Sequence, residues 1–182
     1  VPFCQERCYY CDFNTYAGVE HLIPAYLVAL QEEIRYLIPK AGKRLPVHTI
    51  FFGGGTPSLL STGQTGKILD ELSKGFDLQD GAEISLEANP GTVTARQLIE
   101  LQQMGFNRIS FGVQSFYDQE LIQLGRIHDV EDTMKAFRWA AQAGFKNVSL
   151  DLIFGLPGQN LARWKYSLKN ALSLNPTHIS LY

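Results

Sequence analysis

Residues 105–110 read Gly-Phe-Asn-Arg-Ile-Ser, and residues 144–149 read Gly-Phe-Lys-Asn-Val-Ser, two similar stretches 39 positions apart. Each starts with a glycine placed to stop a helix and continues into a β-rich run. Helical solenoids also have periods near 40 residues, but a helix stop followed by a strand is better explained by a βα unit. The chain is therefore expected to repeat strand and helix.

The rest of the chain alternates in the same way. β-rich apolar runs occupy residues 47–52, 83–88, 108–113, 147–154 and 177–182, and helical spacing of apolar residues covers 25–37, 65–76, 94–104 and 132–143. Strands separated by helices run parallel, with right-handed crossovers. With one more strand expected just before Cys4, the pattern predicts an α/β fold of about six βα units. A partial (β/α)6 TIM-like barrel is favoured, and a doubly wound sheet is the alternative.

Composition limits the possible functions. The 182 residues are 45% hydrophobic and 19% charged, which is ordinary for one globular domain. A formal net charge of −2 offers no basic excess for nucleic acid or an anionic membrane. The sequence contains no run of eighteen apolar residues, so no membrane-spanning helix is predicted. The clustered cysteines cannot form a secreted disulfide framework, so a reducing cytoplasm is expected.

The expected secondary structure elements at both ends of the sequence look incomplete. Val1-Pro2-Phe3 leads into Cys4 without room for a full first strand, and the run 178–182 stops without a turn. We therefore expect residues 1–182 to be one core domain, truncated at both ends, of a longer protein with a further C-terminal domain.

All three cysteines, Cys4, Cys8 and Cys11, lie in one short loop. Thiolates with three and then two intervening residues can wrap around a metal centre. Structural zinc normally takes four ligands from two separated pairs, and no second pair is present. A [4Fe–4S] cluster usually takes four cysteines, so three would leave one iron with an open position. The cluster is favoured over zinc and over three cysteines without a metal.

Three glycines and a threonine follow the run that ends at Phe52. Glycine lets a backbone approach a ligand closely and leaves N–H and C=O groups free to bond it. The stretch matches neither GxGxxG nor a Walker loop. Candidate ligand contacts are therefore Gly53, Gly54, Gly55 and Thr56, and a tight strand-to-helix turn is the alternative.

Polar residues recur at the expected carboxyl ends of the strands, where parallel α/β folds collect their chemistry. Glu87 and Asp151 lie in apolar strand surroundings, where an unpaired carboxylate is costly, so each needs a protein or ligand partner. Gln114 can supply neutral hydrogen bonds, and Arg126 can clamp a carboxylate with two donors. An internal ion pair or cap is the alternative for each, and His128 is a weaker ligand candidate.

The motifs CYYCDFN, FFGGGTPS, LEANPG, RISFGVQSF, LGRIH and DLIFGLPGQ extend along the whole chain. Their combination, a CxxxCxxC loop with aromatic Tyr10 and then GGGTP, resembles the radical S-adenosylmethionine (SAM) superfamily. Within it the chain is similar to the branch that contains oxygen-independent coproporphyrinogen III oxidases and heme chaperones.

The resemblance implies that Cys4, Cys8 and Cys11 bind a [4Fe–4S] cluster whose open iron chelates SAM. The implied chemistry is reductive cleavage of the sulfonium to a 5′-deoxyadenosyl radical, which needs an electron donor to the cluster. The remaining implied SAM contacts are Gly53 to Thr56 for the amino group, Arg126 for the carboxylate, Glu87 beside SAM, Gln114 and Asp151 for the ribose, and Tyr10 near the adenine.

Position 13 separates two functions within this branch. Oxidases are similar but carry a fourth cysteine there, whereas the heme chaperones of the HemW type carry phenylalanine, as this chain does at Phe13. The favoured expectation is a heme chaperone that binds heme and delivers it to an acceptor protein. The alternative is a coproporphyrinogen III dehydrogenase that oxidatively decarboxylates propionates. In either case the client-binding residues are expected outside this chain. A zinc-stabilised binding module would need a fourth ligand that the sequence does not evidently offer.

Overall fold

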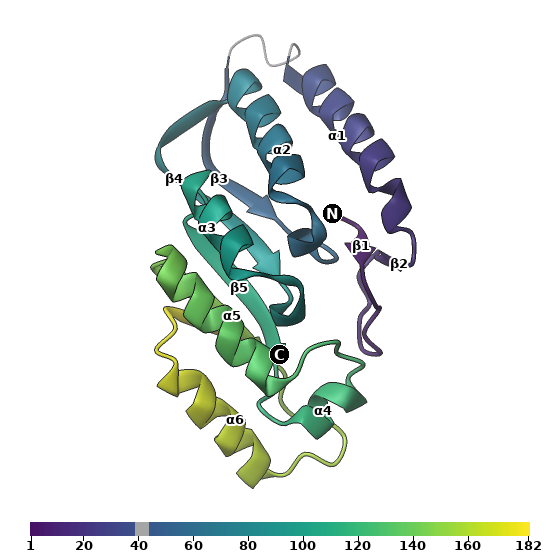
Figure 1. Cartoon of the computed structure of the whole chain (residues 1–182), viewed down its shortest axis with the longest axis vertical. Coiled ribbons are helices and arrows are strands. Elements are labelled where there is room, and N and C mark those ends of the chain that lie inside the picture. Colours follow the sequence, from purple (N-terminus) through teal and green to yellow (C-terminus); the bar gives the residue numbers. More distant parts are fainter. Residues whose placement is uncertain (39–43) are drawn as a thin grey trace.

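The computed structural model describes residues 1–38 and 44–182. Its centre is a five-stranded parallel sheet made of β3 (Pro46–Phe52), β4 (Asp77–Ala88), β5 (Arg108–Gln114), β6 (Asn147–Leu152) and β7 (His178–Leu181). The α-helices are α1 (Ile23–Leu37), α2 (Thr62–Gly75), α3 (Ala95–Gln103), α4 (Asp118–Gln123), α5 (Val130–Ala143) and α6 (Leu161–Ser173), and short 3-10 helices cover Glu20–Leu22, Pro57–Leu59 and Pro90–Thr92. Figure 1 shows the long helices following one another alongside the sheet, from α1 at one end to α6 at the other.

The strand order decides between the two predicted architectures. The strands are hydrogen-bonded in the order β3-β4-β5-β6-β7, which is their order in the chain, and every pair is parallel. A doubly wound sheet reverses its order at a switch point, and this sheet does not. Sequential order with crossovers of one hand is the pattern of a (β/α) barrel. The predicted α/β fold, part of a TIM-like barrel with strands alternating with helices, is confirmed.

The helix boundaries follow local chemistry. Ser61 caps α2: its side chain accepts from the N–H of Gln64, whose own side chain accepts from the Ser61 N–H. The predicted glycine stops are confirmed at Gly105, with φ of 99°, and at Gly144, with φ of 97°. Helix α6 was not predicted, although Trp164, Leu168 and Ala171 carry a helical spacing.

Some strand ends differ from the prediction. β4 begins at Asp77 rather than at residue 83, because residues 77–78 already pair with Pro46 and Val47 before a register shift. Gly81, with φ of 77°, interrupts the strand between the two paired regions, so no single alternating pattern covers it. At the other end of the sheet, β6 stops at Leu152 rather than at residue 154.

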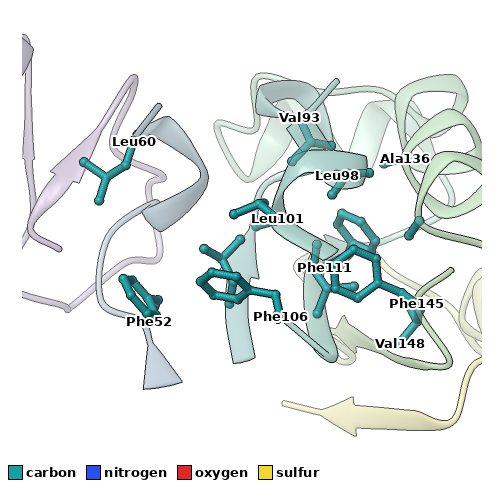
Figure 2. Close-up of a cluster of buried hydrophobic side chains, with 14 of the residues drawn as sticks. Phe52, Leu60, Val93, Leu98, Leu101, Phe106, Phe111, Ala136, Phe145 and Val148 are labelled. Atoms are coloured by element: carbon teal, nitrogen blue, oxygen red, sulfur yellow. The ribbon is translucent and has the colours of Figure 1, made fainter. Parts of the chain in front are cut away.

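The hydrophobic core lies between the sheet and its helices. The side chains of Ile109, Phe111 and Val113 on β5 are almost completely buried. Figure 2 shows Phe111 close to Phe145 and Val148, with α3 and α5 residues nearby. Side chains alternate along a strand, so the next residues face the other way. Those residues on β5 are Ser110, Gly112 and Gln114.

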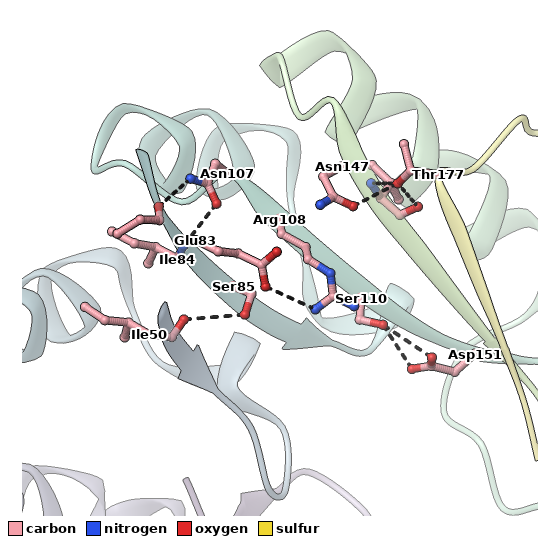
Figure 3. A network of polar contacts seen from close by, with 12 residues as sticks. Ile50, Glu83, Ile84, Ser85, Asn107, Arg108, Ser110, Asn147, Asp151 and Thr177 are labelled. Atoms are coloured by element: carbon pink, nitrogen blue, oxygen red, sulfur yellow. Dashed lines mark hydrogen bonds and ion pairs between the residues drawn. The ribbon is translucent and has the colours of Figure 1, made fainter. Parts of the chain in front are cut away.

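That second face of the sheet is polar. Ser110 Oγ donates to both carboxylate oxygens of Asp151 on β6, at 3.2 and 3.3 Å, and the Arg108 guanidinium lies 4.0 Å from Glu83 on β4 (Figure 3). Parallel sheets are usually apolar on both faces because helices cover both. Polar side chains on one face here are therefore better placed to meet a ligand than to form a second core.

The first residues of the chain lie beside the carboxyl end of β3. The short strand β1 (Phe3–Cys4) pairs in parallel with β2 (Tyr16–Ala17), and residues 1–3 form backbone hydrogen bonds with the loop 53–56. A strand was expected before Cys4, whereas Cys4 is itself the last residue of β1. No helix in the described part of the chain is long and apolar enough to cross a membrane.

Candidate functional site at the carboxyl ends of the strands

A cavity of about 610 Å³ lies at the carboxyl ends of the strands. The predicted site residues that line it are Cys4, Cys8, Tyr10, Cys11, Gly54, Gly55, Thr56, Glu87, Gln114, Arg126 and Asp151. Gly53 does not line it. A Cβ atom at Gly53 would lie 2.3 Å from the Phe51 ring and 3.1 Å from Glu87 Oε2, so the Gly53 backbone packs closely against these two side chains. The structure thus gathers residues that are up to 147 positions apart in the chain, from Cys4 to Asp151.

The three cysteines are free thiols that border the cavity. Cys4 is buried, and the Thr56 hydroxyl donates to its Sγ at 3.5 Å. Cys8 and Cys11 are half-buried and are joined by a turn in which the Cys11 N–H donates to the Cys8 carbonyl at 3.1 Å. The Cys11 Sγ lies 4.0 Å from the Thr15 hydroxyl.

The three thiols can be compared with two kinds of metal centre. Among residues 1–38 and 44–182, no three Cys, His, Asp or Glu side chains are placed to share one metal ion. Zinc needs its ligands to converge on one point. In an iron–sulfur cluster each cysteine binds a different iron, so the sulfur atoms surround a volume. Three cysteines on one loop match the number that would leave a [4Fe–4S] cluster with one open iron.

The glycine loop holds the cysteine segment and lines the cavity with Gly54, Gly55 and Thr56. The N–H of Gly54 donates to Glu87 Oε2 at 3.1 Å, and those of Gly55 and Thr56 donate to the backbone carbonyls of β1 and its preceding residues at 2.7 Å. A Cβ atom at Gly55 would lie 2.6 Å from the Phe3 carbonyl oxygen. The Gly53 carbonyl accepts from the Val1 amino group at 2.9 Å, and the Thr56 carbonyl accepts from the Leu59 N–H at 3.0 Å. Because the N–H groups of the loop are also used within the protein, an ammonium ligand would meet acceptor oxygens here rather than donors.

Two carboxylates face the cavity from neighbouring regions of the sheet. Burial raises the pKa of Glu87, the Gly54 N–H opposes that shift, and the charge of Asp151 adds to it. Asp151 is held by Ser110, whose hydroxyl donates to both of its oxygens. The Asp151 oxygens can still accept from a ligand, since a carboxylate has about four acceptor positions.

Gln114 ends β5 in a conformation that is unusual for its residue type. Its φ is 66°, in the left-handed region, and a register shift separates Gly112 from Gln114 in the pairing with β6. The Gln114 carbonyl accepts from the N–H of Ile153 at 3.0 Å, which ties the turn to the end of β6. Such strain persists where surrounding contacts enforce it and is frequent at functional sites. The turn brings the mostly buried Gln114 side chain to the cavity.

Arg126 reaches the cysteine loop from the turn after α4. Its Nη2 donates to the Gly112 carbonyl at 2.7 Å, and its Nη1 lies 3.3 Å from Cys8 Sγ and 3.5 Å from the Tyr10 hydroxyl. Burial, ahead of all other influences, raises the pKa of Tyr10 to about 12, so this phenol is neutral at ordinary pH. The Arg126 Nε is buried and has no protein partner among the described residues. As a buried atom, this N–H is not open to the cavity in this conformation.

Several residues of the cavity were not predicted from the sequence. Ser110 and Gly112 line it and alternate with the buried residues of β5, so the period of two along that strand was a usable signal. Leu156, in the loop after β6, carries no comparable signal. His128 is not a lining residue: it is 4% exposed, and its Nε2 lies 3.3 Å from the Val113 carbonyl.

Fold and site together define an α/β protein of the partial-barrel type, with thiols, carboxylates and an arginine around one cavity. The family model for the radical SAM superfamily matches residues 1–171. The chain therefore belongs to the radical SAM superfamily, and membership implies a [4Fe–4S] cluster and SAM as cofactors.

Comparison with individual proteins narrows the similarity to one branch. The chain is 43% identical over 183 residues to a heme chaperone HemW of Bacillus subtilis, and 42% identical over 191 residues to one of Escherichia coli, covering all of this chain and 48% of each relative. It is 37% identical to an oxygen-independent coproporphyrinogen III oxidase of Synechocystis, covering 39% of that protein.

A solved structure supports the same grouping. The coproporphyrinogen III oxidase HemN of Escherichia coli, described as a radical SAM enzyme, matches all of this chain and 42% of its own length, with 34% identity and a TM-score of 0.92. The chain spans about half the length of the curated heme chaperones that it matches.

Proposed function

We propose that this chain is the cluster- and SAM-binding core of a heme chaperone, a protein that binds heme and transfers it to an acceptor protein. The main support is similarity along the whole chain to heme chaperones from three bacteria, at 41–43% identity. Identity to the oxidase relative is 37%, which lies within the 36–43% range of the heme chaperone relatives.

In this proposal Cys4, Cys8 and Cys11 hold the cluster, and SAM completes the coordination of the remaining iron. The cluster and SAM supply radical chemistry when bound. Three free thiols on the wall of one cavity support the assignment.

The other lining residues have the chemistry to orient SAM. Carbonyl groups of the loop from Gly53 to Thr56 would accept from its amino group, with Gly53 acting through packing and backbone rather than through the cavity wall. The guanidinium of Arg126, which lines the cavity, would donate to its carboxylate. Gln114 and Asp151 would bond the ribose hydroxyls, with Ser110 fixing the Asp151 carboxylate.

Glu87 and Tyr10 would shape the site without joining the cluster. Glu87 accepts from the Gly54 N–H and so fixes the glycine loop that faces the ligand. Burial raises the pKa of Tyr10, which keeps the phenol neutral beside Cys8 and Cys11. A neutral ring next to the thiolates can pack against the adenine without adding charge.

Partners and location follow from the same proposal. We place residues 1–182 as the core domain, with the heme-binding residues elsewhere in a longer chain, as the relatives' lengths allow. The protein would work in the cytoplasm, take electrons from a reduced donor protein and deliver heme to an acceptor. The slightly acidic charge balance, −2 in total, agrees with a role that does not involve nucleic acid.

A second candidate is an oxygen-independent coproporphyrinogen III dehydrogenase. It is supported by the TM-score of 0.92 and 34% identity to HemN over the whole chain. Phe13 argues against it. Its side chain lies at the cavity, is 70% exposed, and occupies the position where the oxidases resembled by this sequence carry a further cysteine.

Anaerobic assay of the full-length protein separates the two functions. After reconstitution with iron and sulfide, the protein is incubated in parallel with heme alone, and with coproporphyrinogen III, SAM and dithionite. We expect a heme absorption band that co-elutes with the protein, and no protoporphyrinogen by mass spectrometry. Multiple turnovers to protoporphyrinogen would overturn the chaperone proposal. Cys8→Ala controls for the cluster, and Phe13→Cys tests whether position 13 matters.

A further inference from the structure

Arg126 is the side chain that connects the ligand cavity with the cysteine loop. Its Nη1 is 3.3 Å from the Sγ of Cys8, a residue 118 positions earlier in the chain, within hydrogen-bonding distance for sulfur. The same guanidinium is anchored by its Nη2 to the Gly112 carbonyl at 2.7 Å. An anchored, planar cation holds its donors in a defined direction, unlike a flexible surface side chain.

The donors of Arg126 divide between two tasks. Nη1 points to Cys8 and Tyr10, and Nη2 to Gly112. Nε is buried without a protein partner in the described part of the chain. Nη1 is therefore directed at the sulfur while Nη2 holds the guanidinium in place.

We propose that Arg126, beyond any contact with SAM, donates a hydrogen bond to the Cys8 thiolate and thereby raises the reduction potential of the cluster. Arg126 is a positioning and tuning residue in this role, because it acts on the iron through the cysteine sulfur. The inference rests on the proposed assignment of Cys8 as a cluster ligand.

Electrostatics predicts the sign of the change in the reduction potential. A low-potential one-electron donor reduces the cluster from its 2+ to its 1+ state, and no bond is made or broken in that step. The added electron makes the cluster and its thiolates more negative, so a nearby cation that donates to sulfur stabilises the reduced state more than the oxidised state. Removing the guanidinium should therefore make reduction harder.

The test is a redox titration followed by electron paramagnetic resonance, on full-length protein reconstituted without SAM. We expect the midpoint potential of Arg126→Met to be more negative than that of the wild type, and Arg126→Lys to lie between them because it keeps the charge but loses the planar fork. Arg7→Met is the matched control. Arg7 lies in the same loop and its Nη2 donates to the Cys11 carbonyl at 3.1 Å, not to a sulfur.

The inference is tested by comparing the potential shifts of Arg126→Met and Arg7→Met. A shift in Arg126→Met that exceeds the shift in Arg7→Met supports the inference. Equal potentials for the wild type and Arg126→Met, or equal shifts in Arg126→Met and Arg7→Met, overturn it. Iron and sulfide analysis is done first: wild-type protein that cannot hold four irons per chain overturns the cluster assignment, and with it the proposed function. A normal cluster with an unchanged potential overturns the tuning role alone.

A second measurement covers the possibility that Arg126→Met does not assemble its cluster. Wild-type protein with 15N-labelled arginine is reduced and studied by electron spin-echo envelope modulation. We expect a resolved 15N coupling that is lost in Arg126→Lys and kept in Arg7→Met. A reduced wild-type cluster without any 15N coupling contradicts the hydrogen bond, whatever the variants do.

Discussion

Tyr9 packs against Gly125, and this contact joins the cysteine loop to the turn that carries Arg126. A Cβ atom at Gly125 would lie 3.2 Å from Cδ2 and Cε2 of the Tyr9 ring, and the Tyr9 N–H donates to the Leu124 carbonyl at 3.1 Å. Gly125 also has φ of 71°, which favours glycine. The loop between Cys8 and Cys11 is thus seated on a turn 116 positions away in the chain.

Gly125→Ala should therefore harm the protein in two ways. The left-handed backbone costs about 1–2 kcal/mol for a residue with a Cβ atom, and the new methyl group must also displace the Tyr9 ring. Gly81→Ala is the matched control, because Gly81 has φ of 77° but nothing within 4 Å of its Cβ position. We expect both variants to lose stability in urea unfolding and only Gly125→Ala to lose iron after reconstitution. Equal iron content in the two variants would contradict the seating role of Tyr9.

Gly55→Ala should displace β1 rather than strain the loop. Its Cβ would lie 2.6 Å from the Phe3 carbonyl oxygen and 3.1 Å from Cys4 Sγ, and the first contact is with backbone that cannot rotate away. We expect less than half of the wild-type iron content after reconstitution. Gly63→Ala, at a helical position with nothing within 4 Å, should keep full iron content. Normal iron in Gly55→Ala would show that Cys4 does not need this close approach.

His128 should make the stability of the protein depend on pH. Burial, assisted by the charge of Arg126, lowers its pKa to about 3, whereas histidine in an unfolded chain titrates near about 6.5. Between these two pKa values the unfolded state binds a proton that the folded state does not. The contribution of His128 to stability is therefore fully present above the unfolded-state pKa. It is lost progressively as the pH falls towards the folded-state pKa. Acidification from about pH 7 to about pH 5 should cost about 2 kcal/mol through this residue.

The measurement for His128 is the free energy of unfolding in urea at both pH values. His128→Gln can still bond the Val113 carbonyl and should lose about 2 kcal/mol less than the wild type on acidification. His48→Gln, at an exposed strand position, should lose as much as the wild type. Parallel losses in all three proteins would show that His128 accepts a proton in the folded state.

Glu120 should be a stability determinant of the region behind the cavity. It is 2% exposed, and its Oε2 accepts from the Ser115 hydroxyl at 2.5 Å and from Gln159 Nε2 at 3.0 Å. These bonds join the turn after β5, helix α4 and the loop before α6. Glu120→Ala removes the acceptor of a buried donor, Ser115, and of a half-buried donor, Gln159, and opens a cavity, so we expect a loss of about 3 kcal/mol.

A conservative variant and a surface control complete that test. Glu120→Gln keeps an acceptor oxygen and should lose about 1 kcal/mol. Glu131→Ala removes an exposed ion pair with Lys135, 2.8 Å apart, and should change stability by less than about 0.5 kcal/mol. Urea unfolding measures all three. A loss in Glu120→Ala as small as that in Glu131→Ala would exclude a structural role for the Glu120 network.

The sequence predicted most of the secondary structure and the composition of the site for local reasons. Hydrophobic periodicity located the five strands of the sheet and helices α1, α2, α3 and α5, and the glycines at 105 and 144 marked helix ends. It did not locate β1 or the early start of β4. β1 is only two residues long, and the start of β4 is set by a register shift against β3. Both features depend on a partner strand and leave no periodic pattern in the sequence.

By itself, the sequence determined the strand and helix order, the three-cysteine loop and the polar residues at the strand ends, because these are properties of neighbouring positions. Tertiary structure decided which of them meet. It set Arg126 Nη1 beside Cys8 Sγ, turned Gln114 towards the cavity through a left-handed backbone, and used Gly53 for packing against Phe51. Such contacts depend on the register and curvature of the whole sheet, where a shift of one residue would send each side chain to the opposite face.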